Sequence, residues 1–332
     1  KDFEKDFARY TGTKYAIGVG SGTDALYLSL KYLNLKKKDE VITVSNSYLS
    51  TVSTIFLAGA KPVLVDVNYD DYNIDINSIE KKITKNTKVI LPVHLCGRPS
   101  DMEKILKLAK KYKLVVIEDA AQAAGATIGR KKVGSFGLIG CFSFHPLKNL
   151  SGIGDGGMMV TNNKKIYEWS IKARNLGHPS RNECDFWSHN MRLDAIQSVF
   201  LKIKLNDYES VIARRRKNVH LYMQNLCKNV DFPKETKKTR SVYQTFIVKV
   251  KKRTQLINFL KKNGVEAKVH YPIPIHKLKA FRKTNTKKAK LPVTEKLSKE
   301  ILTLPAMEYV KKNQIKRICK LINNFFKKKT QS

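Results

Sequence analysis

Several features that define common protein classes are missing from this 332-residue chain. It has only five cysteines and no Cys-x-x-Cys pair, so neither a zinc site nor a disulfide framework is indicated. Dispersed thiols of this kind are typical of proteins in a reducing cytosol. No apolar run approaches the length of a membrane span. We therefore expect a cytoplasmic protein without a metal site and without a membrane partner.

Acidic residues are scarce, because 28 Asp and Glu stand against 64 Lys and Arg, which gives a net charge of +36. A charge of this size normally points to nucleic acid or an anionic membrane. Here the excess is lysine spread from end to end, 51 residues against 13 arginines, with no basic block longer than four. A nucleic-acid surface needs concentrated charge and aromatic platforms. We therefore expect no nucleic-acid partner and attribute the lysine to a coding sequence rich in A and T.

Length and composition predict two domains. The chain is long for a single core, and its 42% hydrophobic content is enough for two. In residues 1–205 strands alternate with helices, which predicts an α/β domain whose mostly parallel sheet is covered by helices on both faces. Residues 206–332 predict a smaller α+β domain. Its expected elements are strands at 242–250 and 265–271 and helices at 254–262 and 313–326.

Two strands end in residues that can meet at one ligand. The apolar run 114–117 leads into Glu118 and Asp119, and the run 141–144 leads towards Lys148 and a glycine-rich stretch. Open α/β sheets bind ligands at the carboxyl ends of their strands. A carboxylate and an amine at those ends are what pyridoxal 5′-phosphate (PLP) requires. The lysine holds its aldehyde as an imine, and the aspartate pairs with its pyridine nitrogen.

Each of these two residues also has an ordinary interpretation. A single lysine among 51 is usually a hydrated surface group, and Asp119 can be the N-cap of a helix. Lys148, however, follows a strand too apolar for a surface edge and precedes glycines that let the backbone approach a ligand closely. The combination predicts a PLP site far more strongly than either residue does.

A turn near the N-terminus has the form of a phosphate site. Residues 15–19 predict a strand, residues 20–23 a tight turn rich in glycine, and residues 24–33 a helix with apolar side chains at helical spacing. The free N–H groups at such a helix start bind phosphate. The glycines also resemble a dinucleotide-binding turn, but the next strand, 41–44, lacks the terminal carboxylate that would hold a ribose.

Seven groups of residues share their order and near-identical spacing with a known family. They are Ser21-Gly22-Thr23-Asp24-Ala25-Leu26, Gly59-Ala60-Lys61-Pro62-Val63, Pro92-Val93-His94-Leu95, Glu118-Asp119-Ala120-Ala121-Gln122, Gly134-Ser135-Phe136-Gly137, Phe142-Ser143-Phe144 with Lys148-Asn149-Leu150, and Asn190-Met191-Arg192-Leu193-Asp194. With them the chain resembles the DegT/DnrJ/EryC1/StrS sugar aminotransferases, which have fold type I of the PLP enzymes, from Phe3 to about Phe281. Members of the family carry a few dozen residues ahead of this point, so we expect an N-terminal segment to be missing.

The resemblance implies a role for each matching residue. Lys148 would be the Schiff-base lysine and the general acid and base, and Asp119 the partner of the pyridine nitrogen. The other cofactor contacts would be Gln122 beside the ring hydroxyl, Tyr48 stacked on the ring, Thr23, Ser143 and the backbone of Gly22 and Asp24 at the phosphate, and Asn190 reaching the phosphate from the neighbouring subunit. The role of Asn190 implies a homodimer with shared active sites.

The segment from Val269 to His276 resembles the part of the small domain that lines the sugar site. Its two prolines are typical of enzymes that act on a 3-keto sugar nucleotide. The resemblance implies substrate contacts from Arg192, His270, Tyr271 and His276, although each histidine can instead pack or cap locally. The chain departs from the family at Lys277-Leu278-Lys279, where Leu-Gln-Pro is usual, and at Ser188, where glycine is usual. Both departures concern the substrate and the interface rather than the cofactor.

The resemblance implies PLP-dependent transfer of an amino group from glutamate to a keto carbon of a nucleotide-linked deoxysugar. The C3 position is favoured, and C4 is the alternative. Dehydratases of the same superfamily replace the lysine with histidine, so Lys148 argues against that reaction, although His145 lies nearby. Nucleic-acid binding without catalysis is the alternative from another class.

Overall fold

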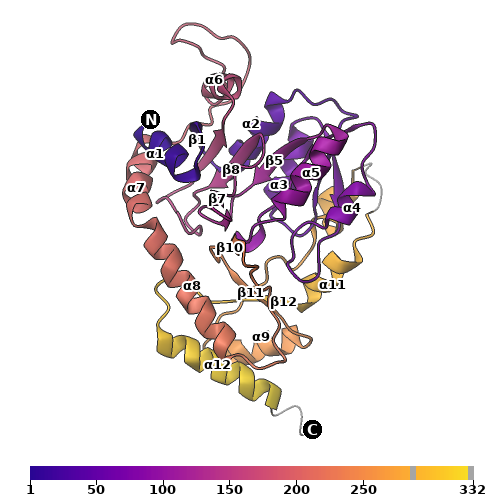
Figure 1. Cartoon of the computed structure of the whole chain (residues 1–332), viewed down its shortest axis with the longest axis vertical. Coiled ribbons are helices and arrows are strands. Elements are labelled where there is room, and N and C mark those ends of the chain that lie inside the picture. The colour runs from indigo at the N-terminus through magenta and orange to yellow at the C-terminus, as the bar shows by residue number, and fades with distance from the viewer. Residues whose placement is uncertain (285–288, 328–332) are drawn as a thin grey trace.

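The computed structural model describes residues 1–284 and 289–327, and Figure 1 shows the chain. Its largest sheet has the strand order β1-β9-β8-β5-β4-β2-β3. Neighbours are parallel from β8 through β5, β4 and β2 to β3, whereas β9 is antiparallel to β8 and β1. The predicted α/β fold with a mostly parallel sheet is confirmed. The strands are β1 (Tyr15–Val19), β2 (Glu40–Val44), β3 (Lys61–Val65), β4 (Thr87–Ile90), β5 (Val115–Asp119), β8 (Ile139–Ser143) and β9 (Gly157–Thr161).

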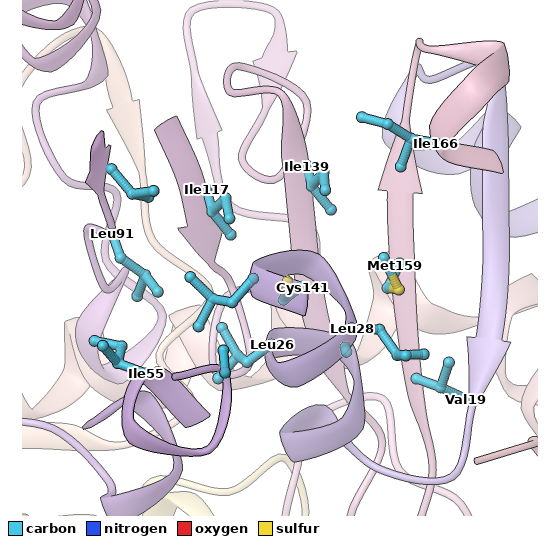
Figure 2. Close-up of a cluster of buried hydrophobic side chains, with 14 of the residues drawn as sticks. Val19, Leu26, Leu28, Ile55, Leu91, Ile117, Ile139, Cys141, Met159 and Ile166 are labelled. Carbon is cyan, nitrogen blue, oxygen red and sulfur yellow. The ribbon is translucent and has the colours of Figure 1, made fainter. Parts of the chain in front are cut away.

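Helices bury both faces of this sheet. On one face, α2 (Gly22–Tyr32) and α6 (Lys164–Ala173) pack on the strands, and Figure 2 shows Leu26 and Leu28 of α2 among the strand residues Ile117, Ile139 and Met159. On the other face, Phe3 and Phe7 of α1 pack with Phe142. Besides α2 and α6, the longer helices in this part of the chain are α1 (Asp2–Thr11), α3 (Leu49–Leu57), α4 (Ile76–Glu80), α5 (Met102–Tyr112) and α7 (Ala195–Asn206).

Local sequence explains where several helices begin and end. The Ser21 hydroxyl accepts the Asp24 N–H at 3.0 Å and caps α2, and Asp101 caps α5 in the same way. These side chains satisfy N–H groups that have no partner inside the helix. Helix α1 ends at Gly12, whose φ of 77° is the left-handed conformation that glycine adopts without strain.

The C-terminal part contains a smaller sheet in which β11 (Phe246–Lys249) pairs antiparallel with β12 (Ile301–Leu304). Around it pack α8 (Tyr208–Asn225), α9 (Arg253–Lys262) and α12 (Lys312–Lys327). The helices predicted at 254–262 and 313–326 are confirmed. The strand predicted at 242–250 is shorter, because only residues 246–249 pair with β12.

The strand predicted at 265–271 is wrong. That segment meets the sheet at a single bridge between Lys268 and Thr303. The place beside β11 belongs to β12, which comes later in the chain, and the prolines at 272 and 274 prevent the segment from extending its pairing. The short elements are β6 (Thr127–Ile128), β7 (Lys131–Lys132), β10 (Thr239–Arg240), η1 (Leu95–Gly97), η2 (Ile275–Lys277), α10 (Lys279–Arg282) and α11 (Pro292–Glu300).

Helix α8 connects the two parts of the molecule. Tyr208 in its first turn lies in the core beneath the large sheet, whereas Tyr222 near its end lies in the core of the small sheet. Further along, Ile275 and Phe281 return to pack against the large part. The division into residues 1–205 and 206–332 stays a prediction. Among the described residues, no helix has the length and apolar character needed to cross a membrane.

Candidate active site

The carboxyl ends of two neighbouring parallel strands place the predicted carboxylate and amine close together. Strand β5 ends at Asp119, which pairs in register with Cys141 of β8. Strand β8 ends at Ser143, and Lys148 lies in the turn that follows. The charges of Asp119 and Lys148 are near enough to influence each other's ionisation. The sheet therefore brings both residues to one site.

The Asp119 side chain is only 4% exposed. Burial raises the pKa of its carboxyl group, while the hydroxyl of Thr51, the N–H of Ala121 and the charge of Lys148 act in the opposite direction. Thr51 Oγ1 donates to Asp119 Oδ2 at 2.8 Å, and the Ala121 N–H donates to Oδ1 at 3.2 Å. A carboxylate held in this way has a fixed direction and favours a cationic partner.

Lys148 is half-buried. Burial lowers the pKa of its amine, while Asp119 acts in the opposite direction, and a lowered pKa makes a lysine amine more nucleophilic. The turn that carries it is fixed from the C-terminal part. Gln244 accepts the Asn149 N–H at 2.9 Å and donates to the Leu147 carbonyl at 2.6 Å. Residues on both sides of Lys148 are therefore held by the other part of the molecule.

The start of α2 lies against the end of β8. A Cβ atom added to Gly22 would come within 2.7 Å of Ser143 Cβ, so a glycine is needed for this close approach. Thr23 Oγ1 lies 2.7 Å from Ser50 Oγ at the start of α3. The Asp24 N–H is already bound by Ser21, and burial raises the pKa of the Asp24 carboxyl group. Gly22, Thr23 and Ser143 thus surround a helix N-terminus that is suited to phosphate.

An aromatic pair lies near this cluster. Tyr48 precedes α3 and is 58% exposed, and its ring centroid lies 6.2 Å from that of Tyr271. Gln122 Nε2 donates to Tyr271 Oη at 3.0 Å, and Gln122 Oε1 accepts the Cys96 N–H at 2.7 Å. The structure therefore joins Tyr271 from the C-terminal part to two residues that are predicted to hold the cofactor. Tyr48 presents an open ring face that can stack on a planar ligand.

Asn190 and Arg192 are placed differently. Both are exposed, at the end of the loop between α6 and α7 that projects from the body in Figure 1. Arg192 Nη1 donates to Asn175 Oδ1 at 2.7 Å. The Gly20 N–H donates to the Met191 carbonyl at 2.8 Å, which ties this segment to the turn before α2. Within one chain, no hydrogen bond of the described residues joins the Asn190 side chain to Lys148 or Asp119, and the backbone of Asn190 forms a bridge with Asn175.

The two histidines also differ in their surroundings. His270 is half-buried, its Nδ1 lies 2.9 Å from Thr303 Oγ1, and burial lowers its pKa, as do the charges of Lys268 and Lys148. His276 is only 7% exposed. Its Nδ1 lies 2.7 Å from Ser45 Oγ, and its Nε2 lies 3.0 Å from Glu295 Oε1. His276 has the surroundings of the packing role that the sequence left open.

Two contributors to the site have no signal in the sequence. Thr51 holds Asp119 although 68 positions separate them, and it lies in an ordinary helical turn. Gln244 fixes the Lys148 turn across 95 positions. Only a predicted packing of α3 on the end of β5 would have pointed to Thr51. Among residues 1–284 and 289–327, no group of three or more His, Cys, Asp or Glu side chains is arranged to hold a metal ion.

The residues present fit PLP. A desolvated amine can take its aldehyde, a buried carboxylate can face its ring nitrogen, and an open tyrosine face can stack on the ring. A helix N-terminus that admits no Cβ at Gly22 can receive its phosphate. These features come from four separate segments of the chain, and PLP has a chemical group to match each of them.

Comparison with known proteins agrees with this geometry. The model of the DegT/DnrJ/EryC1/StrS aminotransferase family matches residues 1–323. The chain is 40% identical over 326 residues to a dTDP-3-amino-3,6-dideoxy-alpha-D-galactopyranose transaminase of Aneurinibacillus thermoaerophilus, with 98% of this chain and 89% of the relative covered.

Solved structures are similar over nearly the whole chain. DesV of Streptomyces venezuelae, in complex with a ketimine intermediate, superposes with a TM-score of 0.94 at 34% identity and covers 98% of this chain and 88% of its own. NtdA of Bacillus subtilis, with bound cofactor PMP, superposes with a TM-score of 0.90 at 29% identity and covers 97% of this chain and 76% of its own.

Proposed function

Because this chain belongs to the DegT/DnrJ/EryC1/StrS aminotransferase family, we propose that it transfers an amino group from glutamate to C3 of a nucleotide-linked keto sugar. The chain is a PLP-dependent nucleotide-sugar aminotransferase. The donor and the keto carbon are the proposed part. The observation that carries the site assignment is the convergence of the Lys148 amine and the buried Asp119 carboxylate at the ends of β8 and β5.

When bound, PLP supplies an electron sink for the C–H bond that breaks beside the amino group. Lys148 is the group that takes and returns the proton, because burial lowers the pKa of its Nζ amine and so favours the neutral form, which can accept a proton. The Asp119 carboxylate, fixed by Thr51, would keep a proton on the ring nitrogen of the bound cofactor. Gly22, Thr23 and Ser143 would hold the phosphate, and Tyr48 and Gln122 would hold the ring.

The C3 position is supported by the transaminase of Aneurinibacillus thermoaerophilus, whose name describes a 3-amino sugar. The test is to supply the purified protein with PLP, glutamate and a panel of 3-keto and 4-keto nucleotide sugars. We expect 2-oxoglutarate to form together with a product whose amine is at C3 by NMR. A product whose amine is only at C4 would show that the enzyme acts on C4 rather than C3. Turnover with other amino acids but not with glutamate would show that glutamate is not the donor.

A dehydratase reaction is the second candidate, and Lys148 argues against it. That reaction would release water from the sugar without consuming glutamate. The same panel distinguishes the two reactions, because only transamination produces 2-oxoglutarate in proportion to the amino sugar.

We further propose that two copies of the chain form the working unit. Helix α7 carries a stripe of exposed apolar side chains, Ile196, Val199 and Ile203, which are 65%, 63% and 65% exposed. They lie three and four residues apart, so they share one helix face. Ile153, 58% exposed, lies next to α7, because its N–H donates to Gln197 Oε1 at 3.0 Å. A contiguous apolar surface of this kind is typical of an interface between subunits.

Val199→Lys tests this interface. We expect the wild-type protein to have the mass of a dimer by light scattering and the variant that of a monomer, because a charge in an apolar interface is unfavourable. His220→Lys, on the exposed side of α8, is the matched control and should remain dimeric. A wild-type monomer would contradict the proposal.

We place the enzyme in the cytoplasm, which is consistent with its five free cysteines.

A further inference from the structure

Three segments of the chain meet at one buried carboxylate that has no role in the site described above. Glu118 and His94 have side chains that are 0% exposed, and His94 Nε2 lies 3.0 Å from Glu118 Oε2. The N–H groups of Gly134, Phe136 and Gly137 each donate to the same carboxylate at 2.7 Å. We call this arrangement of His94, Glu118 and residues 134–137 the Glu118 bracket.

The proton of the His94 ring can be assigned from its contacts. The Ser100 N–H donates to His94 Nδ1 at 3.0 Å. A ring nitrogen that accepts a hydrogen bond carries no proton, so the proton lies on Nε2, which donates to Glu118. The carboxylate therefore receives four donors, which matches the capacity of its two oxygens. Such complete pairing allows an ionised carboxylate to stay buried.

The bracket joins three segments that position the site. Glu118 directly precedes Asp119 on β5, and successive side chains of a strand point to opposite faces. The His94 N–H donates to the Asp119 carbonyl at 3.0 Å, so the segment after β4 is fixed to the end of β5. Residues 134–137 lead into β8, and Lys148 lies in the turn after that strand. One carboxylate thus holds together the supports of both Asp119 and Lys148.

The glycines of the third segment allow it to approach so closely. Gly134 has a φ of +85°, which side chains rarely adopt. A Cβ atom on Gly137 would lie 2.6 Å from the Val116 carbonyl oxygen of β5. The backbone of this segment therefore reaches Glu118 only because both residues lack side chains. The motif at 134–137 is accounted for by the bracket rather than by contact with a ligand.

We propose that Glu118 is a positioning residue for transamination. Through His94 and the N–H groups of residues 134–137, it fixes the ends of β5 and β8 so that the Asp119 carboxylate and the Lys148 amine keep their relative places. The negative charge of Glu118 also adds to the field at that end of the sheet. This inference rests on the proposed roles of Lys148 and Asp119.

Glu118→Gln is the test, because glutamine keeps the size but removes the negative charge and replaces one acceptor oxygen, which receives two of the four donors, with an NH₂ group that cannot accept them. We expect kcat to fall by about 10-fold to 100-fold, while KM for glutamate changes less than about twofold. The readout beyond activity is a pH titration of the visible absorption band of the PLP-loaded protein. Loss of a negative charge disfavours the protonated chromophore. The midpoint of this absorbance titration should therefore be lower in Glu118→Gln than in the wild type, by at least about half a pH unit.

Glu235→Gln is the matched control. Glu235 also receives several donors, from Arg216 and the Ser241 N–H, but it is only half-buried and lies in the C-terminal part. It should lose thermal stability without a change in the titration midpoint. His94→Leu removes one donor and keeps the carboxyl group with its three backbone donors, so it should reduce kcat by a smaller factor than Glu118→Gln does.

The outcomes separate this inference from the site assignment. If the wild-type protein shows no band with PLP, or if the band persists in Lys148→Ala, the assignment of Lys148 fails. If the band behaves as expected but Glu118→Gln has the midpoint and kcat of Glu235→Gln, the positioning role is overturned. Failure of both Glu118→Gln and His94→Leu to yield soluble protein, while Glu235→Gln does, would assign the bracket to folding and also overturn it.

Discussion

The candidate site has two contrasting halves. The ends of β5 and β8 form the first half, which we call the cofactor half, and the segments 190–192 and 270–276 form the second. At the strand ends, Asp119 is buried and its carboxylate is held by Thr51 and Ala121 of the same chain. In the other half, Asn190 and Arg192 are exposed, while His276 is buried away from the cluster. A single chain therefore holds the Asp119 carboxylate in place by itself, whereas it leaves Asn190 and Arg192 exposed, and we propose that a second chain meets them there.

The largest effect is expected from Lys148→Ala. Removal of the amine takes away both the covalent hold on the cofactor and the proton carrier, so kcat should fall by at least about 10⁴-fold. Borohydride reduction of the PLP-loaded wild type, followed by peptide mapping, should place the adduct on Lys148. The peptide with Lys204, whose pKa is also lowered by burial, is the internal control and should be unmodified. An adduct on any other lysine would remove Lys148 from the cofactor half.

Asp119→Asn should have the next largest effect. An amide cannot keep the ring nitrogen protonated, so transamination should slow by about 10³-fold while PLP still binds. Asp39→Asn is the matched control, because Asp39 is also buried but lies just before β2, at the other end of the strands. Stopped-flow absorbance with glutamate measures the rate. Near-normal turnover of Asp119→Asn would show that this carboxylate only packs.

The same contrast decides what could be predicted from the sequence. The sequence was enough to predict Lys148, Asp119 and the turn before α2. Each lies at the end of a strand or within a few residues of it, and parallel strands present their carboxyl ends together. Thr51 and Gln244 were not, because their contacts join positions 68 and 95 apart without a local pattern. The segment 265–271 alternates like a strand, but β12 took the place beside β11, and pairing of this kind depends on tertiary competition.

A mixing experiment tests whether the second half belongs to the partner. Lys148→Ala and Asn190→Ala chains, each inactive alone, are combined under conditions that allow subunit exchange. In a mixed dimer with shared sites, one site collects both changes and the other collects neither. Random pairing makes half the dimers mixed, so activity should recover to about a quarter of the wild-type value. No recovery despite exchange, measured by native mass spectrometry, would assign Asn190 to its own chain's site.

The smallest effects should separate the two histidines. His276 joins the segment after Pro274 to Ser45 at the end of β2 and to Glu295. His276→Gln should therefore reduce the free energy of unfolding by about 1 to 3 kcal/mol, because buried partners lose their hydrogen bonds, while KM for the nucleotide sugar stays the same. His270 adjoins Tyr271 and is half-buried. His270→Gln should therefore raise the KM for the nucleotide sugar about fivefold, which corresponds to the loss of one hydrogen bond to the substrate. The free energy of unfolding should change little. Chemical denaturation and steady-state kinetics on both variants provide the comparison, and each is the other's control. If His276→Gln raises KM without loss of stability, the histidine reaches the sugar in the working enzyme, and the boundary between the two halves lies closer to β2 than this structure places it.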